Sequence, residues 1–240
     1  MAPAFVYHIL SYALSILPKY LRAKLWCYLL NIGERRWGIS VGAARIPGGM
    51  YIKLGLRVRF SEGEALRFVR SKTRLPVPVV VDNFTYGKST YLVMSRMPGY
   101  PLDAFYNSIP PDAEPVLSKQ LSELLAQLRA IPPPSNSVCG FDGGPVHCER
   151  ISMGSNPCGP WESVAAFHEK LMERTLGLNI RPGYGDPEVV HDVIKRAHAR
   201  THRICLTHGD LGPHNILVDE NWKITGIIDW ETCAWMPEYW

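Results

Sequence analysis

The sequence lacks the long apolar run that a membrane-spanning helix requires. Its most apolar stretch, residues 2–17, is interrupted by Pro18 and Lys19, whereas such a helix needs roughly 20 apolar residues. A basic block is also absent: Lys and Arg exceed Asp and Glu by only 26 to 22, so we expect no nucleic-acid surface. The 240 residues contain no repeat and no low-complexity tract, and they suffice to bury a substantial core.

Cysteines at metal-binding or redox spacing are missing too. The six cysteines form no C-x-x-C pair. His147 and Cys148 stand at irregular separations from Cys139 and Cys158, which favours unrelated loop residues over a zinc site. No secretory leader with a cleavage signature is present. We therefore expect reduced thiols in a cytoplasmic protein.

The most informative segments are HGDLGPHN at residues 208–215 and IIDWE at residues 227–231. Asp210 and Asn215 stand five residues apart, and a second acid, Asp229, follows. Oxygen ligands of this kind suit a hard octahedral cation such as magnesium, which bridges to substrate phosphates. Phosphoryl transfer needs such a cation and a base that orients the attacking hydroxyl.

A β-hairpin is predicted between the two segments. Asn215 opens an apolar run at 216–218, residues 219–221 have turn composition, and residues 223–228 form a second strand that leads to Asp229. Folding this hairpin would bring the amide and both acids to one end. The alternative interpretation is a Pro/Gly turn before a surface hairpin that carries acids by chance.

The protein-kinase catalytic loop has the same five-residue spacing between its Asp and Asn. HGDLxPxN, with IIDWE in place of the kinase DFG, resembles the aminoglycoside phosphotransferase and choline-kinase-like family, the small-molecule branch of the kinase fold. The resemblance implies ATP and Mg²⁺ as cofactors and a small-molecule hydroxyl as acceptor, without identifying aminoglycosides as that acceptor. It implies that Asp210 accepts the hydroxyl proton and that Asn215 and Asp229 hold magnesium. His208 is expected to brace the loop.

The upstream sequence predicts a strand, a helix and a second strand. Met50–Gly55 is strand-like, residues 61–69 have apolar residues on one helical side, and residues 75–81 enter a strand. Ser61 and Glu64 make a possible capping box for the helix. This order resembles the small lobe of the family.

The resemblance places further binding residues in this lobe. It implies that Lys53 contacts the nucleotide phosphates and pairs with Glu64; Glu62 is a weaker candidate for that glutamate. It also implies that the backbone from Ser95 to Met97 is the hinge that receives the adenine. Residues 37–49 contain glycines where the phosphate-covering loop is expected, but no G-x-G-x-x-G. Backbone amides can still bind phosphate there, although Gly48-Gly49 also fits a simple hairpin turn.

Residues 2–32 predict an amphipathic helix pair that packs on the small lobe. The alternative is peripheral membrane contact through Phe5, Tyr7, Trp26 and Tyr28.

The expected architecture is α+β, a protein-kinase-like two-lobed fold. It has an N-terminal helical segment (1–34), a small nucleotide-binding lobe with an antiparallel sheet plus helix (35–97), and a mostly helical large catalytic lobe (98–240). Family members usually continue with several helices, so we expect the large lobe to be incomplete and its C-terminal helices to be missing. The leading hypothesis is an ATP- and Mg-dependent phosphotransferase. The alternatives are a catalytically inactive kinase-like module that binds nucleotide or protein, and a membrane-associated scaffold.

Overall fold

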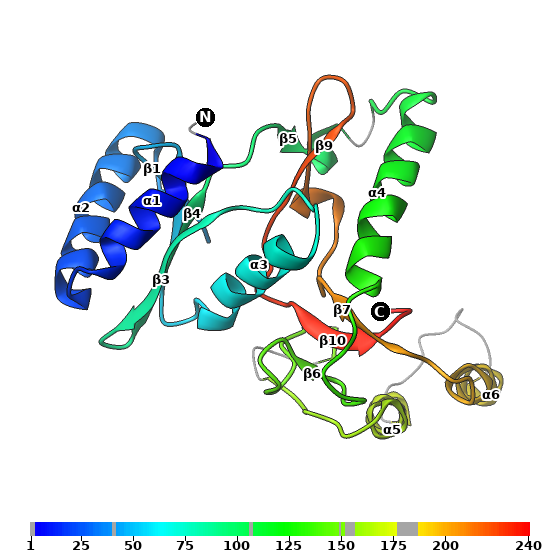
Figure 1. Ribbon diagram of the computed structural model, residues 1–240. Coiled ribbons are helices and arrows are strands. Elements are labelled where there is room, and N and C mark those ends of the chain that lie inside the picture. Colours follow the sequence, from blue (N-terminus) through cyan, green and yellow to red (C-terminus); the bar gives the residue numbers. More distant parts are fainter. Residues whose placement is uncertain (1–2, 40–41, 106–107, 149, 152–156, 177–186) are drawn as a thin grey trace. The chain divides into compact units, whose positions relative to one another are not determined.

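The computed structural model describes residues 3–39, 42–105, 108–148, 150–151, 157–176 and 187–240 (Figure 1). The chain divides into two compact units. The first comprises Met1–Gln127 and Asp210–Glu231, and the second comprises Leu128–Gly209 and Thr232–Trp240. Each unit combines helices with antiparallel strands, which confirms the predicted α+β class.

The first unit contains most of the regular structure. Its elements are α1 (Ala4–Ser15), α2 (Lys19–Trp37), β1 (Ala44–Ile46), β2 (Met50–Gly55), α3 (Phe60–Lys72), β3 (Val80–Tyr86), β4 (Ser89–Ser95), β5 (Tyr100–Pro101), the 3-10 helix η1 (Leu102–Phe105), α4 (Ala113–Arg129, whose last two residues belong to the second unit), the 3-10 helix η2 (Pro213–Asn215), β8 (Ile216–Val218) and β9 (Ile224–Ile227).

Four strands form an antiparallel sheet in the order β1-β2-β4-β3. The predicted strands at 50–55 and 89–95 are confirmed as β2 and β4. The segment at 75–81, predicted to enter a strand, joins β3 at Val80, because Pro76 and Pro78 have no N–H for a strand ladder. The Pro76 carbonyl instead accepts a hydrogen bond from the Ile227 amide at 2.8 Å, so this segment is attached to the end of β9.

The N-terminal helices cover one face of this sheet. Tyr7 of α1 and Trp26 of α2, only 4% and 1% exposed, belong to one buried cluster with Ile52 and Val93. This confirms the prediction that a helix pair packs on the sheet. The alternative of membrane contact through all four aromatics is wrong for Tyr7 and Trp26, because the core buries both rings.

A buried ion pair ties α2 to β3. Arg22 pairs with Asp82, and the Trp26 Nε1 donates to the same carboxylate at 2.7 Å. The Arg22 guanidinium also lies 4.1 Å from the centroid of the Phe84 ring. A buried carboxylate with these partners has its charge compensated, and the position of α2 is fixed.

The helix α3 packs on β3 and β4 with Ala65, Leu66 and Val69 buried. It begins at Phe60, and Arg59 at the N-cap makes no side-chain cap bond. The capping box predicted for this helix is therefore wrong, because Ser61 already lies inside the helix.

A second sheet of the first unit has the order β5-β8-β9. The β8–β9 hairpin confirms the predicted strand–turn–strand, and Asp219 Oδ1 closes its turn by accepting the amides of Asn221 and Lys223 at 3.0 Å each. Gln120 of α4 binds this hairpin twice: its Nε2 donates to the Trp222 carbonyl, and its Oε1 accepts the Ile224 amide. The hairpin is thus fixed on α4.

The second unit contains a three-stranded antiparallel sheet and two helices. Its elements are β6 (Cys139–Gly140), α5 (Val164–Leu176), α6 (Pro187–His198), β7 (Ile204–Thr207) and β10 (Ala234–Pro237). The strand order is β6-β10-β7, with Ala234 opposite both Gly140 and Thr207. All six cysteines lie in the described part of the chain, and none forms a disulfide. No helix among the described residues is sufficiently long and apolar to cross a bilayer.

Candidate active site

Lys53 lies on β2 and points away from the N-terminal helices. Side chains alternate between the two faces of a strand, and its neighbours Ile52 and Leu54 pack in the cluster beneath α1 and α2. Lys53 therefore projects from the opposite face, where α3 lies. The residue is only 7% exposed, and a buried ammonium requires compensating acids.

Two carboxylates provide this compensation. The Lys53 Nζ donates to Glu62 Oε1 at 2.8 Å and Oε2 at 2.9 Å, and to Asp229 Oδ1 at 2.8 Å. Glu62, in the first turn of α3, is 1% exposed. The lysine thus joins three elements of the first unit: the sheet, the helix and the segment after β9.

The glutamate that pairs with Lys53 is Glu62, so the prediction of Glu64 is wrong. Residues two positions apart on a helix point roughly 200° apart, and only one of them can face the sheet. Glu64 is partly exposed and pairs with Arg67 at 2.7 Å. The predicted capping box placed the N-cap at Ser61, two residues after the observed N-cap Arg59.

Gly63 fixes which glutamate faces inward. A Cβ atom at this position would lie 2.4 Å from Asn83 Nδ2 on β3, closer than side-chain atoms tolerate. Asn83 Nδ2 donates to the Phe60 carbonyl at 2.9 Å and to Glu64 Oε1 at 3.3 Å. The first turn of α3 therefore lies directly against β3, and this contact orients Glu62 toward Lys53.

Asp229 stands in a conformation that is rare for a residue with a side chain. Its φ is 65°, in the left-handed region. Trp230, fully buried, donates through Nε1 to the Ile227 carbonyl at 3.0 Å and fixes the turn. Strained backbone of this kind persists where its surroundings hold it and is often found at functional sites.

The loop from Asp210 to Asn215 is held by the Asn215 side chain. Its Nδ2 donates to the Asp210 carbonyl at 2.8 Å and lies 3.4 Å from Asp210 Oδ2. Asn215 is 3% exposed, whereas the Asp210 side chain is 58% exposed. The His214 Nε2 also lies 3.4 Å from Asp210 Oδ2. The loop thus presents an accessible carboxylate from a fixed backbone.

The hairpin places this loop and Asp229 at the same end. Ile216 lies opposite Ile227 in the β8–β9 register, and the Ile228 amide donates to the Asn215 carbonyl at 3.0 Å. Asp210 is attached through Asn215, so the two acids and the amide gather at one end of the hairpin, in the arrangement that the spacing predicted.

Gly209 and His208 precede this loop in the second unit. Gly209 has φ 88°, and a Cβ there would lie 2.2 Å from the Thr232 carbonyl oxygen. Only glycine fits this approach. His208 is buried, and its carbonyl accepts the Thr232 hydroxyl at 2.9 Å. The bracing role of the His208 ring stays a prediction.

A third acid, Glu231, lies beside Glu62 and Asp229 and forms an acidic cluster with them. One carboxylate oxygen from each of Glu62, Asp229 and Glu231 lies within 4.8 Å of the others, and this is the only such group of His, Cys, Asp and Glu in the described part of the chain. Sequence reasoning assigned no role to Glu231. Its nearness to Asp229 in the sequence was the available signal, but the left-handed backbone at Asp229 rules out the alternation of an extended strand.

The cluster has more acids than bases, and this changes its titration. Burial raises the pKa of Glu62 to about 7, although Lys53 opposes the shift. Burial alone would lower the pKa of Lys53, but Glu62 and Asp229 outweigh it and raise that pKa. The surplus of negative charge, with oxygen donors only, fits a hard divalent cation.

The predicted hinge follows β4. The Ser95 amide donates to the Val79 carbonyl, and its Oγ accepts the Val79 amide, both at 2.9 Å. The binding of adenine by this segment stays a prediction. Met97 lies beside Gly226 of β9: a Cβ atom added at position 226 would be 3.0 Å from the Met97 side chain.

The last residues of the glycine-containing segment at 37–49 form a hairpin turn. Ile46 pairs with Met50 across Gly48 and Gly49, which have φ values of 85° and 69°. This confirms the hairpin-turn interpretation of these two glycines. Residues 40–41 lie outside the described residues, so the phosphate-covering role of the segment stays a prediction.

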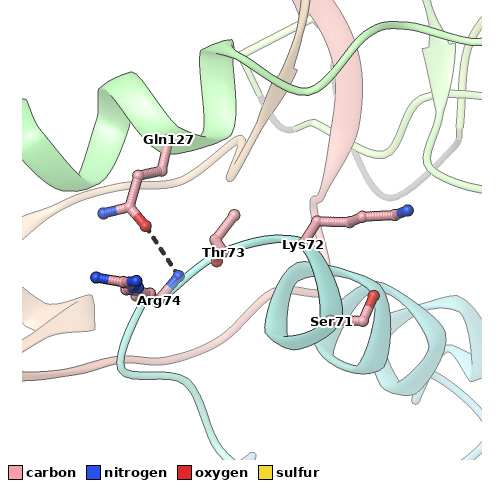
Figure 2. Close-up of a pocket in the computed structure, with 5 residues that line it drawn as sticks. All are labelled: Ser71, Lys72, Thr73, Arg74 and Gln127. Atoms are coloured by element: carbon pink, nitrogen blue, oxygen red, sulfur yellow. Dashed lines mark hydrogen bonds between the residues drawn. The ribbon is translucent and has the colours of Figure 1, made fainter.

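A separate hollow of about 500 Å³ lies at the other end of α3. Figure 2 shows its lining residues Ser71–Arg74 and Gln127, with the Arg74 amide donating to Gln127 Oε1 at 2.8 Å. Ser71 lies nine positions after Glu62 on the helix, roughly 14 Å along the axis. The partial negative charge of a helix C-terminus disfavours anions, so we do not assign the hollow to the phosphate site.

A strand lysine paired with a helix glutamate, beside an Asp–Asn loop and a further acid, is the arrangement of kinase-like phosphotransferases. The chain belongs to the phosphotransferase enzyme family, whose model matches residues 59–240. The resemblance inferred from the motifs is thereby confirmed. No curated protein sequence matches the chain.

Solved structures of similar fold come from the same class. A thermostable mutant of aminoglycoside phosphotransferase APH(4)-Ia, in complex with AMP-PNP and hygromycin B, aligns with a TM-score of 0.54 and 16% identity over 87% of this chain and 72% of that one. A putative fructosamine-3-kinase from Haemophilus somnus 129PT aligns with a TM-score of 0.50 and 16% identity over 82% and 63%. The streptomycin–ATP complex of APH(2″)-IIa gives 0.50 and 14% over 84% and 66%. At these identities the likeness shows the fold alone.

Proposed function

We propose that the chain is an ATP- and Mg-dependent phosphotransferase that acts on a hydroxyl of a small molecule. One observation carries the proposal: Lys53 is hydrogen-bonded to both Glu62 and Asp229, and Asp229 shares its end of the hairpin with Asp210 and Asn215. Family membership supports the transfer chemistry. Nucleotides in the complexes of APH(4)-Ia and APH(2″)-IIa support ATP as the donor.

Lys53 supplies positive charge to the nucleotide phosphates in this proposal. Its buried position means that the charge acts in a medium of low dielectric, where it is worth more than in water. Glu62 orients the ammonium through two hydrogen bonds of 2.8 and 2.9 Å. Because both groups sit on regular elements, their positions are set before a nucleotide arrives.

Asn215 and Asp229 would hold the magnesium, with the Glu231 carboxylate beside them. The Asn215 Nδ2 is used by Asp210, so its Oδ1 is the atom suited to a cation. A bound magnesium would neutralise charge on the transferred phosphoryl group. The amide and carboxylate oxygens match the donors that this cation prefers.

Asp210 orients the acceptor hydroxyl and takes its proton at a carboxylate oxygen. Its exposure leaves room for a small substrate, while Asn215 fixes the backbone that carries it. Little covalent chemistry is required of the chain, since positioning and electrostatics lower the barrier. In this view residues 35–97 act as the nucleotide lobe, with the hinge from Ser95 to Met97 at the adenine. Residues 98–240 then supply the catalytic loop.

The first experiment is thermal unfolding with and without magnesium-ATP, comparing wild type, Asp229→Ala and Glu220→Ala. Glu220 is an exposed acid in the turn of the same hairpin and serves as the matched control. Ligand at a hundredfold excess over its dissociation constant stabilises the folded state by about 2.7 kcal/mol. We expect this magnesium-dependent rise in wild type and Glu220→Ala, and its loss in Asp229→Ala. An equal rise in all three, or none in any, contradicts the proposal.

A further inference from the structure

The outward side of α1 carries an apolar stripe that no described residue covers. Phe5, Ile9, Tyr12 and Ile16 follow one another at helical spacing, and their exposures are 62%, 64%, 73% and 71%. Residues at such spacing share one side of a helix. The opposite side already buries Tyr7 and Leu14 in the core. Both sides of the helix are therefore apolar, although only one of them packs in the core.

The helix α2 repeats this arrangement. Leu21, Leu25 and Tyr28 are 40%, 37% and 66% exposed, whereas Ala23 and Trp26 pack toward the sheet. Both helices cover the same face of the sheet (Figure 1). Their outward sides both face away from the sheet and are together called the outer face of α1 and α2.

The outer face concentrates the exposed apolar surface of the chain. Twenty large hydrophobic side chains are exposed in the described part of the chain, and ten of them lie between Phe5 and Tyr28. These ten fall within a tenth of the sequence. Apolar side chains concentrated along exposed helix sides favour an interaction site, whereas single exposed residues do not.

The acidic and basic residues of α1 and most of α2 have one sign of charge. From residue 3 to residue 33 the sequence contains no Asp or Glu, while Lys19 and Lys24 are exposed. Lys24 lies one turn from both Tyr20 and Tyr28, at the spacing that puts them on one side. Arg22 does not contribute, because it is paired with buried Asp82. Between residues 3 and 33 the exposed Lys and Arg side chains are thus Lys19 and Lys24, and no acid balances them; the first acid, Glu34, lies near the end of α2.

We propose that the outer face of α1 and α2 docks on an anionic lipid bilayer, with both helices lying in the plane of the interface. Helices with aromatic and aliphatic side chains beside lysines bind membranes in this way, and Tyr rings suit the headgroup region. Negative headgroups attract Lys19 and Lys24. A second copy of the chain fits less well, because the same lysines would face each other across the contact. This surface is distinct from the Lys53 cluster, which lies on the opposite side of the sheet.

The test is cosedimentation of the full chain with vesicles. Neutral phosphatidylcholine vesicles are compared with vesicles that contain about 30% phosphatidylserine, at low and high salt. We expect binding to the anionic vesicles that weakens with salt. The triple variant Ile9→Ser, Tyr12→Ser, Ile16→Ser should bind at least about tenfold more weakly. The double variant Lys19→Gln, Lys24→Gln should lose about fivefold for each lysine.

Matched controls are Tyr86→Ser and Val116→Ser, which remove exposed apolar side chains elsewhere (46% and 50% exposed) and should bind like wild type. The thermal midpoint of each variant shows that it folds. The proposal is overturned if wild type does not bind anionic vesicles, or if it binds neutral vesicles equally well. It is also overturned if sedimentation without lipid shows a dimer that the triple serine variant abolishes while vesicle binding is absent.

Discussion

Lys53 and Asp229 stand 176 positions apart in the chain and are joined by a hydrogen bond of 2.8 Å. The same ammonium binds Glu62, so the lysine has two acidic partners on different elements. Asp229 is 42% exposed at its side chain, whereas Glu62 is fully covered. A ligand that reaches this cluster therefore meets Asp229 first, and Glu62 keeps the lysine in place when Asp229 takes another partner.

Replacing Glu62 should impair the reaction far more than replacing its neighbour Glu64. Glu62→Gln removes the charge that orients Lys53, and a misplacement near 1 Å can cost about a hundredfold in rate. We expect ATP turnover to fall by roughly ten- to a hundredfold, and Glu64→Gln to change it less than about twofold. The measurement is steady-state ATP turnover with magnesium. Equal losses in both variants would contradict the assignment of the pair.

Removing the Asp210 carboxylate should impair phosphate transfer while leaving magnesium-ATP binding nearly unchanged. Asp210→Asn keeps the size of the side chain but cannot accept the hydroxyl proton, and loss of a general base costs about 10²- to 10⁴-fold. The magnesium-ATP stabilisation should remain within about 0.5 kcal/mol of wild type, because the substitution leaves Lys53 and its two acidic partners Glu62 and Asp229 unchanged. Calorimetric binding and product formation, measured on the same preparation, check this. Normal phosphate transfer by Asp210→Asn would contradict the proposed role of Asp210 as the base.

Breaking the buried pair of Asp82 should destabilise the first unit strongly. Asp82→Ala leaves Arg22 without its partner beneath α2, and loss of one member of a buried pair costs about 3–5 kcal/mol. Glu173→Ala breaks the exposed pair with Lys170 and should cost less than about 1 kcal/mol. Urea unfolding gives both values. Similar free energies of unfolding for the two variants would show that burial does not govern this pair.

The sequence predicted the parts of the site that are local. Asp210, Asn215 and Asp229 lie on one hairpin, and its strand–turn–strand pattern is encoded by apolar runs around turn residues. The strand that carries Lys53 and the strand that leads to the predicted hinge, β2 and β4, were also predicted by pattern. These features depend on neighbours along the chain, which a sequence displays directly.

The parts that the sequence missed depend on tertiary contacts. The choice of Glu62 over Glu64 follows from the approach of Gly63 to Asn83, a pair twenty positions apart that no periodicity predicts. The start of β3 at Val80 follows from Pro76 and Pro78, which have no N–H groups for a strand ladder. The place of Glu231 in the acid cluster depends on the left-handed backbone at Asp229, which the sequence does not signal.

The second unit should lose stability in mild acid through His168. This residue is 4% exposed, its Nε2 lies 2.6 Å from the Tyr239 hydroxyl, and its ring stacks 3.8 Å from that of His198. Burial, followed by the charge of His198, lowers the pKa of His168 to about 4 from an ordinary value of 6.5. The group therefore stays neutral in the folded chain at a pH where the unfolded chain binds a proton.

Between pH 6.5 and about 4 the unfolded state holds more protons at this position, so the free energy of unfolding falls as the pH falls. One such group contributes at most about 1.4 kcal/mol per pH unit. We expect His168→Gln, which has no titrating ring, to show a shallower decline than wild type across this window. His8→Gln changes an exposed histidine of α1 and should follow the wild-type curve. Urea unfolding at successive pH values measures the slopes. If the slope of His168→Gln equals that of wild type, the acid sensitivity arises elsewhere and the buried imidazole does not control it.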